Sequence, residues 1–476
     1  MNVCRAGLLL ILTAAFAAGQ TPNPQPSSST KTGSRTEKKS DKKIEKKKAV
    51  RLLEQGRRRL REQGEKGARK AVVLFREALV ADPECEDCWW ELGWSYRLLG
   101  RWNASLRAWN QLRSLDPYYP ELEVYYSSVV LAVHLDIDTL PPPELEPAEG
   151  PTLTLNAVGD VHMGRAWPEE RALLPPNDAQ DLLEGVKDLL ADADITFGNL
   201  ETVLLDEGDS EKCGTRSTRC FAFRVPTVYS QALKDAGFDV LSIANNHAGD
   251  FGEAGRLATM KALDEREILH SGPVGDIASW DTKSLRIALI AFSTGANVYR
   301  VQEIEAAKKL VARLDRVHDL VLVSFHGGAE GSGAVHVAEG VEMFLGENRG
   351  DLRRFAHGVI DAGADLVLGH GPHRLRAMEV YQGRLIAYSL GNFSSWKTFK
   401  LTGPLGTTGI LKVELAANGV LLRAEMIPVT IADPGRPQPD PENDAIETVR
   451  ALSLQDFGHV VLDEKGVYER TDTGAQ

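Results

Sequence analysis

Hydrophobic and polar positions divide the chain into a helical front and a longer segment of alternating strands and helices. From about residue 152, short β-rich apolar runs alternate with amphipathic stretches. The runs predict strands over 153–158, 195–197, 240–243, 285–292, 320–324, 366–368, 379–380, 384–389, 409–415 and 420–427. The amphipathic stretches predict helices over 179–192, 225–236, 253–267, 304–316, 351–361 and 444–453. This alternation favours an α/β fold around a largely buried sheet.

The helical front carries an internal repeat. Asp82-Pro83 recurs 34 residues later as Asp116-Pro117, and Phe75 maps onto Trp109 by the same offset. The order of large, small and aromatic residues between them resembles the tetratricopeptide repeat, carried by Trp89, Leu92, Gly93, Tyr96, Gly100 and Ser105. We expect a small all-α, tetratricopeptide-like domain over 49–138, with repeats at 51–85 and 86–119 and a further helix near 121–135. Such a domain serves as a spacer or docks a protein partner.

The remaining segments are expected to be targeting or connecting sequence. Arg5 precedes an apolar run over 6–18 that is too short to cross a bilayer, and Ala15-Phe16-Ala17 offers a cleavage site. Residues 1–19 are therefore interpreted as a signal peptide, with a retained anchor helix as the alternative. Residues 20–48 are expected to form a solvated basic linker, 139–151 a Pro-rich linker and 433–476 a C-terminal extension.

Charge is unevenly distributed along a chain of ordinary globular composition. Hydrophobic residues make up 43% and charged residues 26%, which excludes wholly disordered, collagen-like and polytopic membrane proteins. The net charge is −12, yet residues 21–70 hold 17 basic and 6 acidic residues. A basic arm on an acidic body argues against a nucleic-acid-binding domain. The run at 46–48 is interpreted as part of a soluble tether, with peripheral contact to an anionic membrane or wall polymer as the alternative.

Cysteine placement bears on the cellular compartment. In an exported chain Cys85, Cys88, Cys213 and Cys220 would meet an oxidising environment, whether periplasmic, extracellular or at the cell envelope. Local spacing favours pairing of Cys85 with Cys88 and of Cys213 with Cys220 among three connectivities. For Cys85 and Cys88, a zinc half-site or redox pair is less favoured than a disulfide or free thiols.

Polar and metal-capable side chains follow the predicted strands of the α/β segment. They are Asp160 and His162, Asn199 and Glu201, Asn245, Asn246, His247 and Asp250, His326 and Glu330, and His370, His373 and Asn392. Five of the 11 histidines fall in this layer. Ligands in open α/β sheets bind beyond the carboxyl ends of strands, and imidazoles with carboxylates are the donors of a two-metal site. Each motif alone also fits turns or surface residues; together they predict a shared metal centre.

The same motifs resemble the CapA family, also called poly-γ-glutamate biosynthesis proteins, which is similar to the calcineurin-like metallophosphoesterases. The resemblance covers about 152–430 of a domain expected over 152–432. It is carried by Gly159-Asp160, Asn199-Leu200-Glu201-Thr202, Asn245-Asn246-His247-Ala248-Gly249-Asp250, His326-Gly327-Gly328-Ala329-Glu330, Gly369-His370-Gly371-Pro372-His373 and Tyr388-Ser389-Leu390-Gly391-Asn392-Phe393. It implies a metallophosphoesterase-like layered α/β sandwich. The resemblance does not extend to the helical front.

The resemblance also implies roles for individual residues. The expected metal ligands are Asp160, His162, Glu201, Asn246, His326, His370 and His373, with Glu201 in place of a bridging carboxylate. His247 would act as general acid or charge stabiliser. The expected substrate-binding residues are Arg165, Asn199, Asn245, Asp250, Glu330, Arg374 and Asn392, whereas Arg376 is favoured as structural. The chain departs from the phosphoesterase pattern at Asn199, at Asn245 and in the longer Gly-His-x-Pro-His, which leaves phosphoester cleavage open.

Two functional hypotheses follow. In the first, the chain is an exported, metal-dependent hydrolase or transferase acting on an anionic polymer, such as poly-γ-glutamate or a capsule or wall precursor, or on a phosphoester. Its cofactor would be a divalent metal, two ions of Mn, Zn or Fe being indistinguishable from the sequence. In the second, the same pocket binds polymer without catalysis while the repeats dock an assembly or transport partner.

Overall fold

The computed structural model describes residues 35–99, 102–116, 119, 122, 147–148, 150–210, 212–213, 221–331, 333–399 and 401–470. The predicted signal peptide and most of the Pro-rich linker lie outside these residues, as does most of the predicted helix near 121–135. None of the described helices combines the length and apolar character needed to span a bilayer.

The helical front contains two helix pairs. They are α1 (Arg35–Gln63) with α2 (Glu65–Ala81), and α3 (Glu86–Leu98) with α4 (Trp102–Leu115). In each pair a glycine faces an aromatic ring: a Cβ on Gly56 would lie 2.3 Å from Phe75, and one on Gly93 would lie 2.1 Å from Trp109. Any larger residue would clash with the ring, so only glycine allows the ring to pack directly against the first helix of its pair. The helices are present as predicted, whereas their tetratricopeptide nature stays a prediction.

Helix α1 corrects the expected linker, because it begins at Arg35 rather than near residue 49. The segment contains a single large apolar residue, Ile44, but is rich in Lys and Glu, which have high helix propensity. Buried Ala49, Leu52 and Leu53 anchor the later turns of α1 in the helical core, so the helix extends backwards into polar sequence. Low hydrophobicity excluded a core contribution here but did not exclude a helix.

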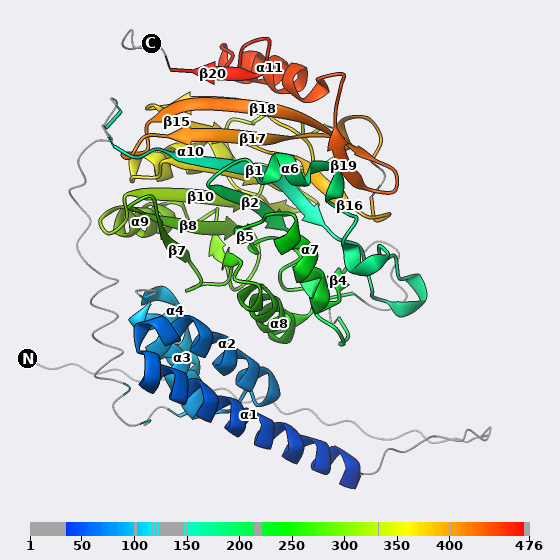
Figure 1. Cartoon of the computed structure of the whole chain (residues 1–476). Coiled ribbons are helices and arrows are strands. Elements are labelled where there is room, and N and C mark those ends of the chain that lie inside the picture. The colour runs from blue at the N-terminus through cyan, green and yellow to red at the C-terminus, as the bar shows by residue number, and fades with distance from the viewer. Residues whose placement is uncertain are drawn as a thin grey trace, which may run out of the picture. The chain divides into compact units, whose positions relative to one another are not determined.

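The α/β segment contains two main sheets (Figure 1). The first has the order β19 (Arg436–Pro439), β18 (Leu421–Ala432), β17 (Thr407–Leu415), β1 (Leu153–His162), β2 (Ile195–Leu200), β5 (Val240–Ser242) and β6 (Leu269–Ser271). Beside this path, β16 (Asn392–Ser395) pairs with β1, and β20 (Val467–Glu469) pairs with β18. Strand β1 is parallel to β2 and β16 and antiparallel to β17.

The second sheet has the order β14 (Met378–Tyr381), β15 (Arg384–Ala387), β13 (Leu366–His370), β10 (Leu320–His326), β8 (Leu285–Ser293) and β7 (Ala278–Thr282), with β9 (Tyr299–Arg300) beside β8. Two short two-stranded sheets are formed by β3 (Val203–Leu204) with β4 (Arg224–Val225) and by β11 (Met343–Phe344) with β12 (Glu347–Asn348).

Three apolar layers hold the sheets together. Residues of both sheets, including Leu155, Phe197, Leu322 and Leu368, form one buried core between them. A second core packs α7 (Ser230–Asp235) and α8 (Gly252–Glu265) on the first sheet. A third packs α9 (Ile304–Asp315) and α10 (Leu352–Asp361) on the second sheet. The α/β fold predicted from the alternation is thus present, with its strands divided between two sheets.

Two predicted helices are shorter and broken. The stretch 179–192 contains η2 (Asn177–Ala179), η3 (Glu184–Val186) and α6 (Lys187–Leu190), because Asn177, Asp178 and Ala179 all adopt positive φ. The stretch 225–236 begins with β4 and η4 (Thr227–Tyr229) before α7, because Pro226 has extended backbone. Apolar spacing was correct in both, but it does not reveal local backbone breaks.

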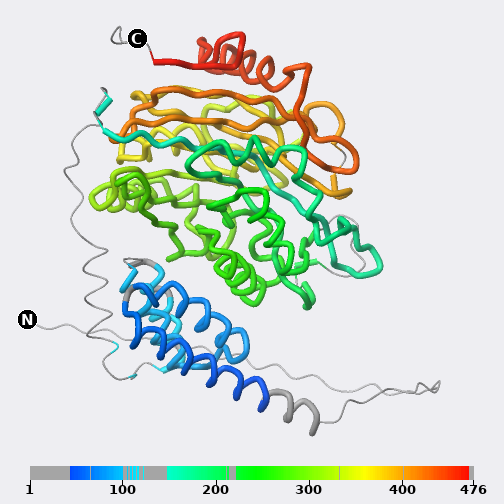
Figure 2. Tube along the Cα trace, viewed as in Figure 1, coloured from blue at the N-terminus to red at the C-terminus, as the bar shows by residue number. Residues whose placement is uncertain are grey.

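The expected C-terminal extension is instead part of the sandwich (Figure 2). Strands β19 and β20 both pair with β18, and α11 (Asp444–Phe457) packs its buried residues into the core between the sheets. Proline in β19 is tolerated because this strand forms the outer edge of its sheet. The boundary predicted at 432 therefore does not separate a structural unit.

Candidate metal centre

The candidate metal centre lies where the carboxyl ends of strands from both sheets meet. In the first sheet, Asp160 on β1 stands opposite Asn199 on β2 and Asn392 on β16. In the second sheet, His326 on β10 stands opposite His370 on β13. Parallel pairing brings these side chains to one edge, as expected for ligand sites of α/β sheets.

The loop after β13 brings a further histidine to this edge. Gly371 has φ +113°, and a Cβ there would lie 2.5 Å from the carbonyl oxygen of Gly327. Only glycine fits this turn, which lets the chain reverse directly after His370. His373 follows with positive φ, 59°, and its ring turns toward β1.

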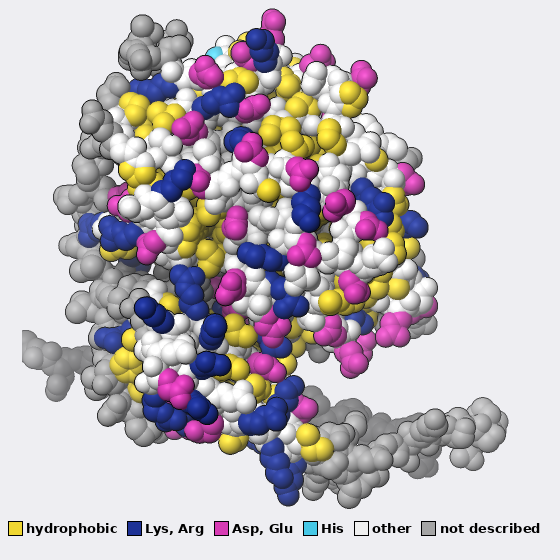
Figure 3. Space-filling view, viewed as in Figure 1, with side chains coloured by type: hydrophobic (Ala, Val, Ile, Leu, Met, Phe, Trp, Pro, Cys, Tyr) yellow, Lys and Arg dark blue, Asp and Glu magenta, His cyan; other side chains and the backbone are white. Residues whose placement is uncertain are grey.

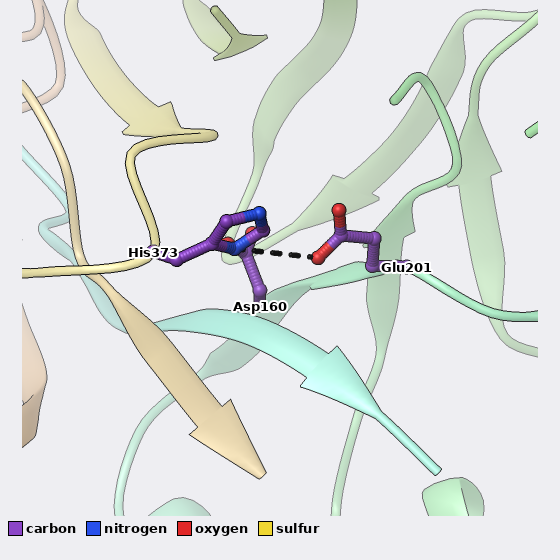
Figure 4. Close-up of side chains that lie close together, drawn as sticks. All are labelled: Asp160, Glu201 and His373. Atoms are coloured by element: carbon purple, nitrogen blue, oxygen red, sulfur yellow. Dashed lines mark hydrogen bonds and ion pairs between the residues drawn. The ribbon is translucent and has the colours of Figure 1, made fainter. Parts of the chain in front are cut away.

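Asp160, Glu201 and His373 are the one group among the described residues with the compactness of a metal site (Figure 4). Their ligand atoms all lie within 4.8 Å of one another. His373 Nδ1 is 2.9 Å from Asp160 Oδ2 and 3.7 Å from Glu201 Oε2. Asp160 and Glu201 are fully buried, so two carboxylates share a small volume inside the protein.

Two more imidazoles border the same carboxylates. His370 Nδ1 lies 3.3 Å from Asp160 Oδ1, without the geometry of a hydrogen bond. His326 Nε2 lies 3.7 Å from Glu201 Oε1. Asn199 donates to Asp160 Oδ1 at 2.8 Å and contacts His326 Nδ1 at 3.3 Å, so it orients both groups. Asn245 donates to Asn199 Oδ1 at 3.3 Å and to the Leu200 carbonyl at 2.9 Å.

Several buried polar atoms around this group have no hydrogen-bond partner among the described residues. They are Glu201 Oε1 and Oε2, His162 Nε2, Asn246 Oδ1, His326 Nε2, and His370 Nδ1 and Nε2. Leaving one such atom unsatisfied costs about 1–3 kcal/mol. All are N or O donors that divalent metals accept, so the residues present fit a metal centre.

Protonation states also suit cation binding. Burial lowers the pKa of His162 and of His326 well below the usual value, so both imidazoles are neutral and keep a lone pair. Burial would raise the pKa of Asp160, but the imidazoles of His370 and His373 hold it well below its usual range. Asp160 is therefore a carboxylate.

Glu201 and His373 titrate differently. Burial raises the pKa of Glu201 above its usual range, and the Asp160 and Glu330 carboxylates add to this effect. Burial disfavours charge on His373, yet Glu201, Asp160 and Glu330 outweigh it and raise its pKa to about 10. Without a cation, protons thus balance the carboxylates, and a bound divalent ion would replace them.

His247 is held at the rim of the centre by Asp250. Its Nδ1 lies 2.7 Å from Asp250 Oδ2, and its Nε2 faces Glu201 Oε1 at 4.0 Å. Lys212 Nζ contacts Asp250 Oδ1 at 2.5 Å and the Asn246 carbonyl at 3.2 Å. Burial lowers the pKa of His247, opposed by Asp250 and assisted by Lys212. The pairing fixes the ring so that Nε2 points toward the centre.

Sequence reasoning missed Lys212 and two phenylalanines near the histidines. Phe223 lies 4.2 Å from the His162 ring and 4.5 Å from the His247 ring, and Phe399 lies 5.8 Å from His373 (ring centroids). Lys212 precedes Cys213, which is disulfide-bonded, and that cysteine was the one signal that the loop has a fixed shape. The predicted partner, Cys220, lies outside the described residues. Cys85 and Cys88 form a disulfide, as predicted.

The remaining predicted substrate-binding residues do not all point at the centre. Glu330 lies 3.9 Å from His373 Nε2 but is held by Arg349 at 2.9 Å. Asn392 donates to the carbonyls of His373 and Leu405, so it supports the loop. Two arginines complete the set: Arg165 donates to the Arg171 carbonyl, and Arg374 is buried. Arg376, which was expected to be structural, is paired with Glu342.

Fold and centre together describe a mixed α/β protein with a buried His and carboxylate cluster at strand ends. The chain matches the family described as bacterial capsule synthesis protein PGA_cap over residues 154–396, slightly more than half of its length. It belongs to this family, which confirms the resemblance found in the sequence.

Curated relatives agree with this membership. The chain is 28% identical over 317 residues to the capsule biosynthesis protein CapA of Bacillus anthracis, covering 61% of this chain and 70% of that protein. It is 26% identical over 275 residues to the PGA biosynthesis protein CapA of Bacillus subtilis, covering 53% and 65%. A probable polyglutamine synthesis accessory protein of Mycobacterium tuberculosis is 30% identical over 225 residues, covering 42% and 55%.

Solved structures are more distant. The NAD nucleotidase NadN of Haemophilus influenzae is similar at 11% identity and TM-score 0.32, covering 66% of this chain and 57% of that chain. The purple acid phosphatase PPD1 of yellow lupin is similar at 11% identity and TM-score 0.31, covering 62% and 55%. Scores this low assign no function.

Proposed function

We propose that the chain is a metal-dependent hydrolase or transferase that acts on an anionic polymer or phosphoester during synthesis of a capsule or another envelope polymer. The observation that carries the proposal is the set of buried, unpaired N and O atoms contributed by strand ends of both sheets. Such atoms destabilise the fold unless a ligand satisfies them.

The names of the relatives support an envelope polymer as the substrate. Two are named for capsule or PGA biosynthesis, and a third for accessory function in polyglutamine synthesis. An anionic polymer also suits the chemistry, because a divalent cation attracts carboxylate and phosphate oxygens.

A pair of divalent ions, when bound, would polarise a substrate oxygen and lower the pKa of a bound water. Asp160, Glu201, His326, His370 and His373 would hold these ions, with His162 and Asn246 completing the donor set. His247, oriented by Asp250, would act at Nε2, as general acid in its protonated form or as a stabiliser of charge on the substrate. The aromatic rings of Phe223 and Phe399 would limit water around the histidines.

Export to the envelope is part of this proposal. The disulfide between Cys85 and Cys88 and the disulfide-bonded Cys213 support it, because such bonds persist in oxidising compartments. The helical front would provide the surface for a protein partner.

The test combines metal content with turnover. Purified wild type should carry a transition metal detectable by elemental analysis and hydrolyse bis-p-nitrophenyl phosphate or a γ-glutamyl substrate. Glu201→Gln should lose metal, whereas His247→Ala should keep metal and lose about 10²–10⁴-fold in turnover. His459→Ala is the matched control, because His459 is exposed and remote in sequence from the strand-end motifs.

The outcomes separate the two hypotheses. Metal binding without turnover on either substrate class would refute the enzyme and favour a polymer-binding assembly or transport factor. Absence of metal from wild type, with no binding on addition of Mn²⁺, Zn²⁺ or Fe²⁺, would refute the metal centre itself.

A further inference from the structure

Helices α1 and α2 present a concentrated basic surface. Ten exposed Lys and Arg residues lie between residues 46 and 70, and we call them the basic surface: Lys46, Lys47, Lys48, Arg51, Arg58, Arg59, Arg61, Lys66, Arg69 and Lys70. Figure 3 shows Lys and Arg side chains gathering over these helices. The chain as a whole has a net charge of −12, so the charge of this surface is opposite in sign to that of the whole protein.

The helix period aligns part of this surface into a stripe. Lys47, Arg51, Arg58 and Arg61 are spaced by four, seven and three residues, which places them on one side of α1. The opposite side carries buried Ala49, Leu52, Leu53 and Gly56. Helical rise spreads the stripe over about 20 Å.

Few of these charges are neutralised within the described part of the chain. Lys46 pairs with Asp82 and Glu84, Lys48 with Glu45, and Arg58 with Glu62. The other seven members form no ion pair with a described residue, although Arg59 and Arg61 interact with the Glu62 carboxylate at longer range. By contrast, Arg57, on the inner side of the same helix, pairs with Glu54, Asp87 and Glu91.

The spacing of like charges indicates that the basic surface binds a ligand rather than only contacting solvent. Lys47 with Arg51 and Lys66 with Lys70 stand four residues apart, where like charges destabilise a helix. A solvated helix surface usually alternates sign at this spacing. Three of the four cations in the stripe, Lys47, Arg51 and Arg61, form no ion pair with a described residue, and such a row suits a ligand that carries its anions in a row.

We propose that the basic surface binds a linear polycarboxylate chain, electrostatically and outside the metal centre. This inference rests on the proposed function for the identity of the polymer. Membrane binding is less favoured, because the apolar side of α1 is covered by the helical core and cannot enter a bilayer. The surface would retain polymer near the α/β segment without taking part in its chemistry.

The experiment uses the full chain and fluorescein-labelled poly-γ-glutamate, with binding measured by fluorescence anisotropy at about 50 and 200 mM NaCl. Wild type should bind, and more weakly at the higher salt. Replacing Lys47, Arg51, Arg58 and Arg61 with Gln should weaken binding about tenfold or more. The matched control replaces four other exposed basic residues, Lys187, Lys309, Arg316 and Lys465, with Gln and should bind as wild type does.

Further measurements keep the outcomes distinct. Circular dichroism should show equal helix content in both variants, and turnover of bis-p-nitrophenyl phosphate should match wild type. Equal loss of binding in both variants, or unchanged binding in the stripe variant, overturns the proposal whatever the turnover. Stripe-dependent binding to phosphatidylglycerol vesicles but not to polymer overturns it in favour of a membrane surface. Lack of wild-type turnover on both bis-p-nitrophenyl phosphate and a γ-glutamyl substrate instead refutes the proposed enzyme.

Discussion

Arg76 on α2 makes a buried ionic contact between the helical front and the α/β segment. Its side chain is 1% exposed. Its guanidinium lies 2.5 Å from Asp264 on α8, 3.1 Å from His270 Nε2 on β6 and 3.6 Å from Asp276, and it donates to the Tyr96 hydroxyl. We predict that Arg76→Met destabilises the protein by removing the cation from this group.

The magnitude follows from what remains after the substitution. Removing one partner of a buried ion pair typically costs about 3–5 kcal/mol. Here His270 still contacts Asp276 at 2.6 Å and Asp264 at 3.3 Å, and Asp264 is partly exposed, so the remaining carboxylates are not left alone. We therefore expect a loss of about 2–4 kcal/mol in the free energy of unfolding.

The assay is urea unfolding of the full chain followed by two probes. Tryptophan fluorescence weights the helical front, where Trp89, Trp90, Trp94 and Trp109 lie, and circular dichroism reports on both parts. Arg76→Met should lower the midpoint and separate the two transitions. Arg69→Met on the same helix is exposed and should change stability by less than about 0.5 kcal/mol.

A double-mutant cycle sharpens the test. Arg76→Met combined with Asp264→Asn should be less destabilised than the sum of the single variants, because the two side chains share one interaction. If Arg76→Met matches the Arg69 control, or if the two effects are additive, the cluster does not hold the helical front to the α/β segment.

Three further predictions concern His270, the protons of the candidate metal centre and the turn at Gly371. Two aspartates outweigh burial and raise the pKa of His270, so its contribution to stability is complete below the unfolded pKa and lost as pH rises through the folded one. Urea titrations of metal-free wild type and His270→Gln should therefore show a smaller loss of stability over this pH range in the variant, and equal losses would contradict the prediction. Metal affinity, measured by competition with a chelator, should rise with pH. The reason is that Glu201 and His373, whose pKa values are raised, must lose their protons before they can bind the metal. An affinity that does not change with pH would exclude both as ligands. Gly371→Ala should displace the loop from the Gly327 carbonyl and reduce bound metal at least as strongly as His373→Ala, whereas full metal content would contradict the argument from φ.

The sequence predicted the core of the candidate centre because parallel strands present their carboxyl ends at one edge. Asp160, Glu201, His326, His370 and His373 follow strands that were recognisable from apolar runs alone, and the structure brings these five side chains together. Their roles as ligands stay a prediction. The assignment of strands to two sheets was not predictable, because apolar runs do not state which strands pair.

Residues that act through the backbone or through apolar contact escaped prediction for a different reason. Phe223 and Phe399 look like ordinary core residues in sequence, and only tertiary packing places their rings against histidines. Asn392 was expected to contact substrate, yet its amide supports the carbonyl of His373. An amide side chain has the same appearance in sequence whether it faces a ligand or a loop.

The candidate metal centre could nevertheless be predicted from the sequence, because its residues lower the stability of the fold when they are buried without partners. A buried carboxylate such as Glu201 with neither oxygen hydrogen-bonded costs stability, and the same holds for Nε2 of His326 and for both imidazole nitrogens of His370. Apolar residues at these three positions would pack the same edge without that cost. A bound ligand that satisfies these polar atoms explains why destabilising side chains occur at several strand ends in both sheets. Metal binding should therefore stabilise the folded chain against unfolding.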